Sequence, residues 1–587
     1  MRVVWGLLVV ALLVGSGLLV HPATAPYLRW KLATLFQREV DRLTMYDHLS
    51  ENDTPLSAAQ LQRIEVVRKQ FPNDFNINWA AALAQAKSST ERTRQELSQL
   101  AVDFGDRPEV YAGLIRNECR QLHLGRAEEG YFEDRPRPIS PARPSDRQAA
   151  QRILEWARRG EQLDAQNSFF SAMRAIALLV LKRDEEAIRA LKSAARKPKW
   201  DDYLDEEVEA QVRFMRLYTG GRSADMDYAL KTAALFPHIS YQRLMARVMV
   251  VLAAAHERQG RIRDGLAIRL ALAEYSGRLR SKASWLSHAL TSVSITEITS
   301  AVPGGEKVKP PLWLTAMANR AQQTASDSLC SGGICFPAFR GHVEWQNQRF
   351  LLYLKVHGFE REAHWFAAEY KRADAMFTQT YQALKRFNEK TLIPLIRRYY
   401  WWLFGFFFTL GLLWCLGWMW LALGVAARWH LSLPATLMIA LAVMLLATIW
   451  FAESAAAELM WRARESARAA ESGFREGIDA YQEAAARLAR SGRWGLPFFA
   501  FLINGLLLGL GLLWLAATRR LATEQSVPIL WRFATVVGLV FLLALNGLMI
   551  AQVHFEKRLE QFAAMMRQNE VQLYLQGKRV PFEPPPR

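Results

Sequence analysis

The sequence predicts an all-α membrane protein with an N-terminal membrane anchor, a large helical soluble domain and a C-terminal four-helix transmembrane bundle. Apolar residues recur at intervals of three and four through most of the 587 residues, and strand signals are scarce. This spacing is the period of an amphipathic helix. Four long apolar segments also lie in the last third of the chain, and another follows Arg2.

The four C-terminal segments are the expected transmembrane helices, at residues 401–425, 433–451, 496–517 and 533–551. None contains a charged residue, and each can cross a hydrocarbon core of about 30 Å. Aromatic residues gather near the ends, as expected for membrane interfaces. Short linkers close two hairpins. The longer middle linker is helical in its spacing, and it either stands on the membrane as a helical hairpin or lies flat in the headgroups.

The two membrane hairpins show an approximate duplication. Tyr381-Gln382 before the first hairpin matches Tyr481-Gln482 before the second, and a proline opens the second span of each pair. Two spans per unit would make the repeats parallel. Chance similarity between apolar segments remains the alternative.

The notable polar and packing residues of the spans are Asn504, Gly505, Gly509 and Asn546. The two asparagines fall in the same leaflet, so a hydrogen bond across the second hairpin is expected. Gly505 and Gly509 have the spacing that lets two membrane helices approach closely. Helix packing is favoured over a polar transport site, because no ionisable group lies at membrane depth.

The N-terminal segment at residues 3–20 is a signal sequence or an uncleaved signal anchor, and we favour the anchor. It places Arg2 in the cytoplasm and the large domain outside, at a bacterial-type plasma membrane. The arginines of the linker at residues 453–494 favour the opposite orientation, since short loops rich in Lys and Arg stay in the cytoplasm. We expect the large domain to be extracytoplasmic, because the first helix usually sets the orientation of a membrane protein.

Turn signals divide the soluble region into consecutive helices. Asn73-Asp74 and the stretch from Gly105 to Pro108 are expected turns, and Pro- and Arg-rich residues 134–147 are an expected loop. Residues 301–312 form a second expected loop. The predicted organisation is an anchor or signal at 1–25, helical parts at 26–140, 141–304 and 305–398, a membrane hairpin at 399–452, a helical hairpin at 453–494, a second membrane hairpin at 495–552 and a helical tail at 553–587.

One stretch, from Ser168 to Pro198, resembles a tetratricopeptide repeat. The small and large residues of the family's two helices fall on Ala175, Leu178, Ala187, Leu191 and Ala194, while Lys182-Arg183-Asp184 occupies the turn, where the family usually has glycine. Weaker echoes pair Gly260 with Gly265 and Gly358 with Ala363. The resemblance covers about one repeat and implies a degenerate helical array; an ordinary irregular helical domain is the alternative.

Motifs for catalysis, cofactors or metals are not found, so we expect a protein that is not an enzyme and carries no cofactor. Cys330 and Cys335 form the one local cysteine pair; a structural disulfide is favoured over free thiols in an exported domain. The net charge of +18 rests largely on arginines near the spans. Attraction to anionic lipid explains this charge better than nucleic-acid binding.

The sequence therefore predicts an integral membrane protein that presents a helical-repeat domain for protein–protein interaction or scaffolding. The expected partners are the lipid bilayer and a protein bound by the helical domain, with no nucleic acid. The alternative is a membrane transport or assembly subunit that uses the duplicated four-helix bundle.

Overall fold

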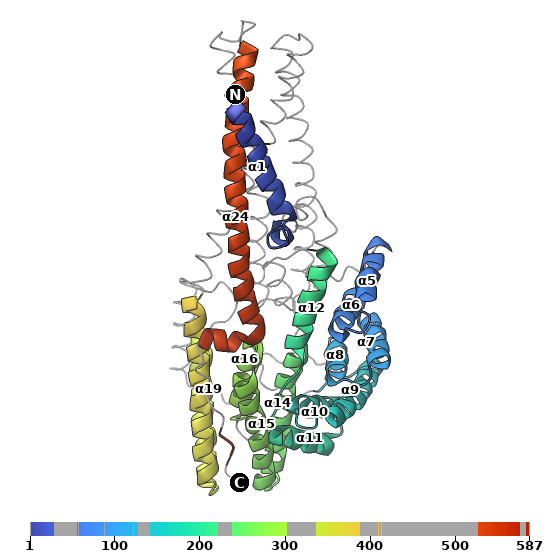
Figure 1. The fold of residues 1–587 in the computed structure, drawn as a ribbon. Coiled ribbons are helices and arrows are strands. Elements are labelled where there is room, and N and C mark those ends of the chain that lie inside the picture. The colour runs from blue at the N-terminus through green and yellow to red at the C-terminus, as the bar shows by residue number, and fades with distance from the viewer. Residues whose placement is uncertain are drawn as a thin grey trace.

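The fold was analysed in a computed structural model, shown in Figure 1. The structure describes residues 2–28, 56, 58–86, 89–120, 122–126, 141–220, 237–301, 336–387, 409, 413, 526–575 and 583–585. Within these residues every regular element is a helix, which confirms the all-α class. The helices are α1 (Arg2–Val20), α5 (Ala58–Gln70), α6 (Phe75–Ala86), α7 (Thr90–Phe104), α8 (Pro108–Glu118), α9 (Pro144–Leu163), α10 (Ser168–Val180), α11 (Asp184–Arg196), α12 (Leu204–Thr219), α14 (Pro237–Arg258), α15 (Ile262–Lys282), α16 (Leu286–Ile298), α18 (Phe336–Val356), α19 (Glu360–Phe387) and α24 (Ser526–Leu575).

The helix boundaries follow local chemistry. The two expected turns separate α5 from α6 and α7 from α8. Residues 134–147 are not wholly a loop, because α9 begins at Pro144. Proline suits the first turn of a helix, where its missing N–H leaves no hydrogen bond unmade. The side chain of Asp146 also accepts a hydrogen bond from the backbone N–H of Arg143, at 2.8 Å.

Three helical hairpins share one turn geometry. The turn residues Lys182, Gly260 and Gly358 all have positive φ, of 58°, 78° and 78°. In each turn the next residue donates its N–H to the carbonyl five residues earlier, at 2.9, 3.0 and 2.9 Å. This is the pattern by which a left-handed residue ends a helix and satisfies its last carbonyls. Hairpins α10–α11, α14–α15 and α18–α19 therefore have equivalent turns.

Helices α6 to α11 pack in chain order, each against the next, as an antiparallel array (Figure 1). The five residues that carry the repeat resemblance are all buried, with exposures between 0% and 3%. Helix α12 then folds back onto α5 and α6, and its apolar residues join theirs in one core. Residues such as Val208, Phe214 and Tyr218 fill this core from α12. The face of the first helices that α12 covers is therefore packed within the chain.

The second half of the domain buries charged residues. Arg269 on α15 lies 2.7 and 3.0 Å from the two carboxylate oxygens of Glu257 on α14. Its remaining guanidinium nitrogen donates to the carbonyls of Thr299 and Ala301, both at 2.7 Å, after the end of α16. A second buried pair joins Arg280 to Glu369 at 2.6 Å. These charges lie out of water, so each depends on its partner.

Helix α24 is the one described helix that is long and apolar enough to cross a membrane, over Thr535–Met565. The expected fourth span, at residues 533–551, begins two residues earlier. Apart from Thr409 and Leu413, the other three expected spans and the linker at 453–494 lie outside the described residues. As predicted, the helix continues past the apolar segment, and its one break is at Asn569, where φ is −165° and ψ is 91°.

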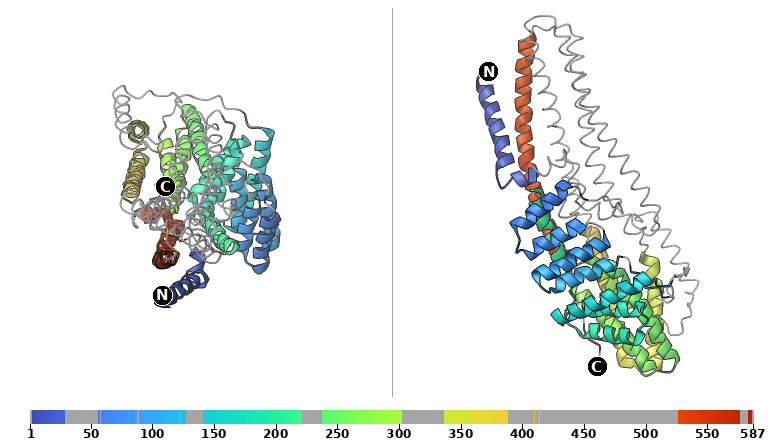
Figure 2. Two further views of the ribbon diagram at one scale, coloured as in Figure 1. Left: turned by 90° about the horizontal axis from the view of Figure 1, so that it is seen from above. Right: turned by 90° about the vertical axis from the view of Figure 1, so that its right-hand side faces the viewer.

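Helix α1 lies along α24 and projects with it from the helical array (Figure 2). The two helices run in the same direction, and both end toward the soluble domain (Figure 1). Leu545, Met549 and Val553 of α24 pack with Tyr27 and Leu28, which follow α1. The segment at residues 3–20 is therefore a helix, as expected, packed against α24.

Candidate functional site

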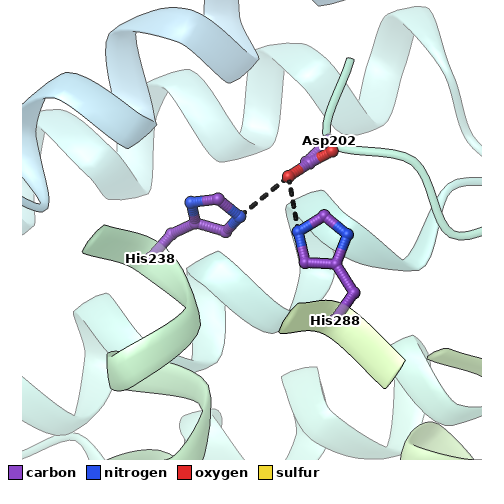
Figure 3. A group of neighbouring side chains, drawn as sticks. All are labelled: Asp202, His238 and His288. Carbon is purple, nitrogen blue, oxygen red and sulfur yellow. Dashed lines mark ion pairs between the residues drawn. The ribbon is translucent and has the colours of Figure 1, made fainter. Parts of the chain in front are cut away.

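Asp202, His238 and His288 meet at one point in the interior of the soluble domain (Figure 3). Oδ2 of Asp202 lies 2.8 Å from Nε2 of His238 and 3.2 Å from Nε2 of His288. The exposed fractions of the three residues are 3%, 0% and 0%. Among the described residues, these three side chains form the one group whose ligand atoms lie close enough together to hold a metal ion.

The backbone around Asp202 is fixed from several sides. The amide of Asn167, just before α10, donates to the carbonyl of Asp201 at 2.8 Å and accepts from its N–H at 3.0 Å. Arg116 of α8 donates to the backbone carbonyl of Asp202 and also pairs with Glu207. Asp202 therefore reaches the cluster from a short segment held between α10, α8 and the start of α12.

The two imidazoles come from the beginnings of two helices, His238 from α14 and His288 from α16 (Figure 3). Aromatic rings enclose them. Trp200 lies 4.6 Å from His288, and Phe169 lies 5.7 Å from His238, measured between ring centroids. Edge-to-face contacts of this kind fix the ring orientation and exclude water. The two imidazoles thus pack against aromatic rings.

Burial governs the protonation of the cluster. Desolvation lowers the pKa of His238 to about 4, although the Asp202 carboxylate opposes this shift. For Asp202, burial acts to raise the pKa, but the two imidazoles outweigh it and hold that pKa well below its usual range. At neutral pH the site therefore presents an ionised carboxylate beside a neutral His238 imidazole.

Hydrogen bonding inside the cluster is incomplete. The separation between Asp202 and His238 suits a hydrogen bond, but its alignment does not. Oδ2 of Asp202 and both ring nitrogens of His238 are buried and lack a well-aligned hydrogen-bond partner among the described residues. Two imidazole nitrogens and a carboxylate oxygen are a common ligand set for divalent transition metals.

A second polar site joins α24 to the soluble domain. Glu560 lies 2.7 Å from Arg216 of α12 and accepts a 2.5 Å hydrogen bond from the hydroxyl of Tyr27. About two turns further along α24, Arg567 pairs with Glu209 of α12 at 3.0 Å. The end of the helix is held by the backbone, because the N–H of Val571 donates to the carbonyl of Ser284 at 3.1 Å, just before α16. We call these contacts the α24 junction.

Asn546 is the one site residue expected from the sequence that lies within the described residues. Its Nδ2 donates to the carbonyl of Ala11 in α1 at 2.8 Å. A methyl group on Gly15 would meet the Asn546 side chain at 2.8 Å, so glycine permits the close approach of the two helices. The other singled-out residues, Cys330, Cys335, Asn504, Gly505 and Gly509, lie outside the described residues.

The sequence reasoning missed all three residues of the buried cluster. His238 and His288 lie on different helices and far from Asp202 in the chain. No short motif marks the three positions. The available signal was weaker: each histidine stands near the start of an apolar helical segment, where a charged side chain would be costly.

Comparison of the chain with protein-family models, with curated proteins and with solved structures finds no match at any of the three levels.

Proposed function

We propose that this protein is a non-catalytic membrane scaffold, whose helical domain is held in a fixed orientation to the bilayer and binds a protein partner. The observation that carries the proposal is the continuity of α24. Its apolar segment, Thr535–Met565, leads without a break into the α24 junction. The helix is unbroken as far as Arg567, where an ion pair with Glu209 holds it. The segment beyond the break at Asn569 is held by the hydrogen bond of Val571 to Ser284. The orientation of the span is therefore passed on to the helical array.

The arrangement of α1 and α24 supports an orientation with Arg2 on one side of the membrane and the helical array on the other. The two helices are parallel, and the array lies at the carboxyl end of both (Figure 1). With Arg2 in the cytoplasm, as a signal anchor requires, the array is extracytoplasmic.

The partner site that we propose is a basic hollow beside α11. It is lined by Arg189, Lys192, Arg196 and Lys197, together with Ala165, Gln166 and Ser193. Lys197 is 3.1 Å from Glu161, whereas Arg189, Lys192 and Arg196 have no ion pair with a described residue. A surface of this charge fits an acidic segment of a partner, and complementary charge also speeds association.

The place of the hollow argues against lipid as its occupant. Helix α11 lies at the end of the molecule away from α1 and the apolar part of α24 (Figure 1). A membrane surface attracts basic residues only over about 10 Å at 0.1 M salt, so a hollow at the opposite end of the molecule is poorly placed for lipid. An acidic protein segment is the occupant that fits both the charge and the position.

Chemical cross-linking of the full-length protein in its native membrane tests the proposal. We expect one predominant cross-linked protein, identified by mass spectrometry, with cross-links to lysines of α11 such as Lys192. The double variant Arg189→Glu, Lys192→Glu should weaken capture of that partner by at least about tenfold, because like charges oppose each other across the contact.

The matched control is Lys69→Glu, Arg92→Glu, which makes the same charge change at exposed residues of α5 and α7. It should leave capture unchanged. Capture that falls equally in both variants indicates a general electrostatic effect. The absence of any reproducible cross-linked protein contradicts the scaffold proposal itself.

The transport alternative receives less support from the described residues. Asn546, a polar residue of the apolar part of α24, is buried at 5% exposure and donates to the backbone of α1. A side chain used in this way fixes two helices together.

A further inference from the structure

We propose that Asp202, His238 and His288 form a structural binding site for one divalent transition-metal ion, with zinc as the best fit. The three side chains come from three separate segments: the chain before α12, the start of α14 and the start of α16. All three are buried, and they point at a common centre (Figure 3).

The distances suit a shared ion. Ligands bound to zinc at about 2.0–2.2 Å lie roughly 3–3.5 Å from one another in a tetrahedral site. Oδ2 of Asp202 is 2.8 and 3.2 Å from the two Nε2 atoms. All three ligand atoms lie within 4.8 Å of one another, so small side-chain rotations bring them around one ion.

The incomplete hydrogen bonding points to the same conclusion. A buried carboxylate oxygen and a buried imidazole without aligned partners are costly, because both lost water on folding. Oδ2 of Asp202 and Nε2 of His238 are such atoms, although they are close neighbours. A cation between them satisfies both lone pairs at once.

The ligand types indicate which metal is preferred. Two imidazole nitrogens and one carboxylate oxygen suit zinc and its neighbours, whereas magnesium and calcium prefer all-oxygen sites. Complete burial of the ligands leaves no face open to a substrate, so the expected role is structural. The ion would tie α14 and α16 to the segment that leads into α12.

Neighbouring groups already orient the ligands. Oδ1 of Asp202 accepts from the N–H of Leu204 at 3.3 Å, which leaves Oδ2 directed at the histidines. Trp200, which contacts the ring of His288, is itself fixed by a 3.2 Å hydrogen bond to Tyr275. Outer contacts of this kind are typical of metal sites, where they set the position of each ligand before the ion binds.

Metal content of the full-length protein is the direct test. The protein is purified in mild detergent with an affinity tag that contains no histidine, and its metals are measured by mass spectrometry. We expect about one zinc per chain. After removal of metal with a chelator, added zinc chloride should raise the thermal midpoint, while magnesium chloride should not. Cobalt(II) in place of zinc should give the visible absorption of a tetrahedral site.

Three variants locate the ion. His238→Gln and His288→Gln should each lower zinc affinity at least about tenfold, while the control His256→Gln, on the same helix as His238, should not. His288→Cys keeps a metal ligand, so its cobalt form should gain a thiolate charge-transfer band in the near ultraviolet. This variant keeps the test decisive where a glutamine variant does not fold.

Two results would overturn the proposal. One is wild-type protein that contains no zinc and whose thermal midpoint does not respond to added zinc. The other is zinc bound equally tightly by the wild type and by folded cluster variants, since the ion then lies elsewhere. In either case the three side chains are a buried proton-sharing group with no metal.

Discussion

Hairpin α10–α11 turns at Lys182 and hairpin α14–α15 turns at Gly260, and the two turns make the same backbone hydrogen bonds. Their interiors differ at equivalent positions. Three residues before the turn residue, the first hairpin has Leu179 and the second has Glu257. Nine residues after it, the first has Leu191 and the second has Arg269. One backbone arrangement therefore accepts either two leucines or an ion pair.

The comparison shows what the charged pair adds. Leu191 can only fill space, whereas Arg269 also reaches two carbonyls at the end of α16 and lies 4.9 Å from the ring centre of Phe350 on α18. A cation at the carboxyl end of a helix is favourable because of the helix dipole. The second hairpin is thus connected to two further helices through one side chain, at the cost of burying a charge.

The largest expected effect follows from breaking this pair. Arg269→Leu leaves Glu257 charged and buried without its partner, so we expect a loss of about 3–5 kcal/mol in the free energy of unfolding. Denaturant titration of the full-length protein in detergent measures it. The control Leu191→Met, at the equivalent position, should cost less than about 1.5 kcal/mol. Similar losses of stability in both variants would show that the ion pair contributes no more than ordinary core packing.

The double variant Glu257→Leu, Arg269→Leu should be more stable than Arg269→Leu alone. It makes the second hairpin resemble the first and leaves no buried charge. The carbonyls of Thr299 and Ala301 still lose their donor, so a residual cost of about 1–3 kcal/mol is expected. Denaturant titration of both variants measures the difference in the free energy of unfolding. A double variant at least as destabilised as the single variant would show that the guanidinium acts mainly on α16 and not on Glu257.

A third prediction compares Ala187 with Gly265, five residues after the two turn residues. A methyl group on Gly265 would lie 2.6 Å from the carbonyl oxygen of Ala253 and 2.5 Å from a carbon of Glu257. Gly265→Ala should therefore cost about 1–3 kcal/mol through overpacking. Ala187→Gly should cost about 1–2 kcal/mol, because it lowers helix propensity and also removes a buried methyl group. A neutral Gly265→Ala would mean that α14 and α15 separate more easily than their packing indicates.

The smallest expected effects concern the turn residues themselves. Lys182 has a φ of 58°, a conformation that glycine adopts more readily than lysine. Lys182→Gly should therefore be neutral to stabilising by about 1 kcal/mol, whereas Gly260→Ala should destabilise by about 1 kcal/mol. No atom lies within 4 Å of a methyl group on Gly260, so its effect reports backbone strain alone. Thermal midpoints of the two variants, moving in opposite directions, check this.

The sequence predicts features that depend on neighbouring residues. The hairpin from Ser168 to Pro198, its buried small residues and its turn are visible in apolar spacing and helix-ending signals. The continuation of the last apolar helix toward Leu575 is visible for the same reason. Each needs information from only a few adjacent turns of helix.

Contacts between distant segments were not predictable in this way. Glu257 looks like a solvated residue near the end of a helix, and its partner is a residue of the next helix. Asp202 follows another aspartate in a polar turn, and nothing nearby indicates that two histidines meet it. Such pairings follow from how whole helices stack, which a single sequence does not reveal.

The contact between α1 and α24 also has a consequence for the order of events during synthesis. The hydrogen bond from Asn546 to Ala11 joins residues 535 positions apart. At about 5–20 residues per second, the ribosome needs roughly half a minute to two minutes to make that length of chain. Throughout this time α1 lacks the surface against which it finally packs. Helix α1 is therefore completed by a helix made much later, and a chain truncated before α24 leaves it exposed.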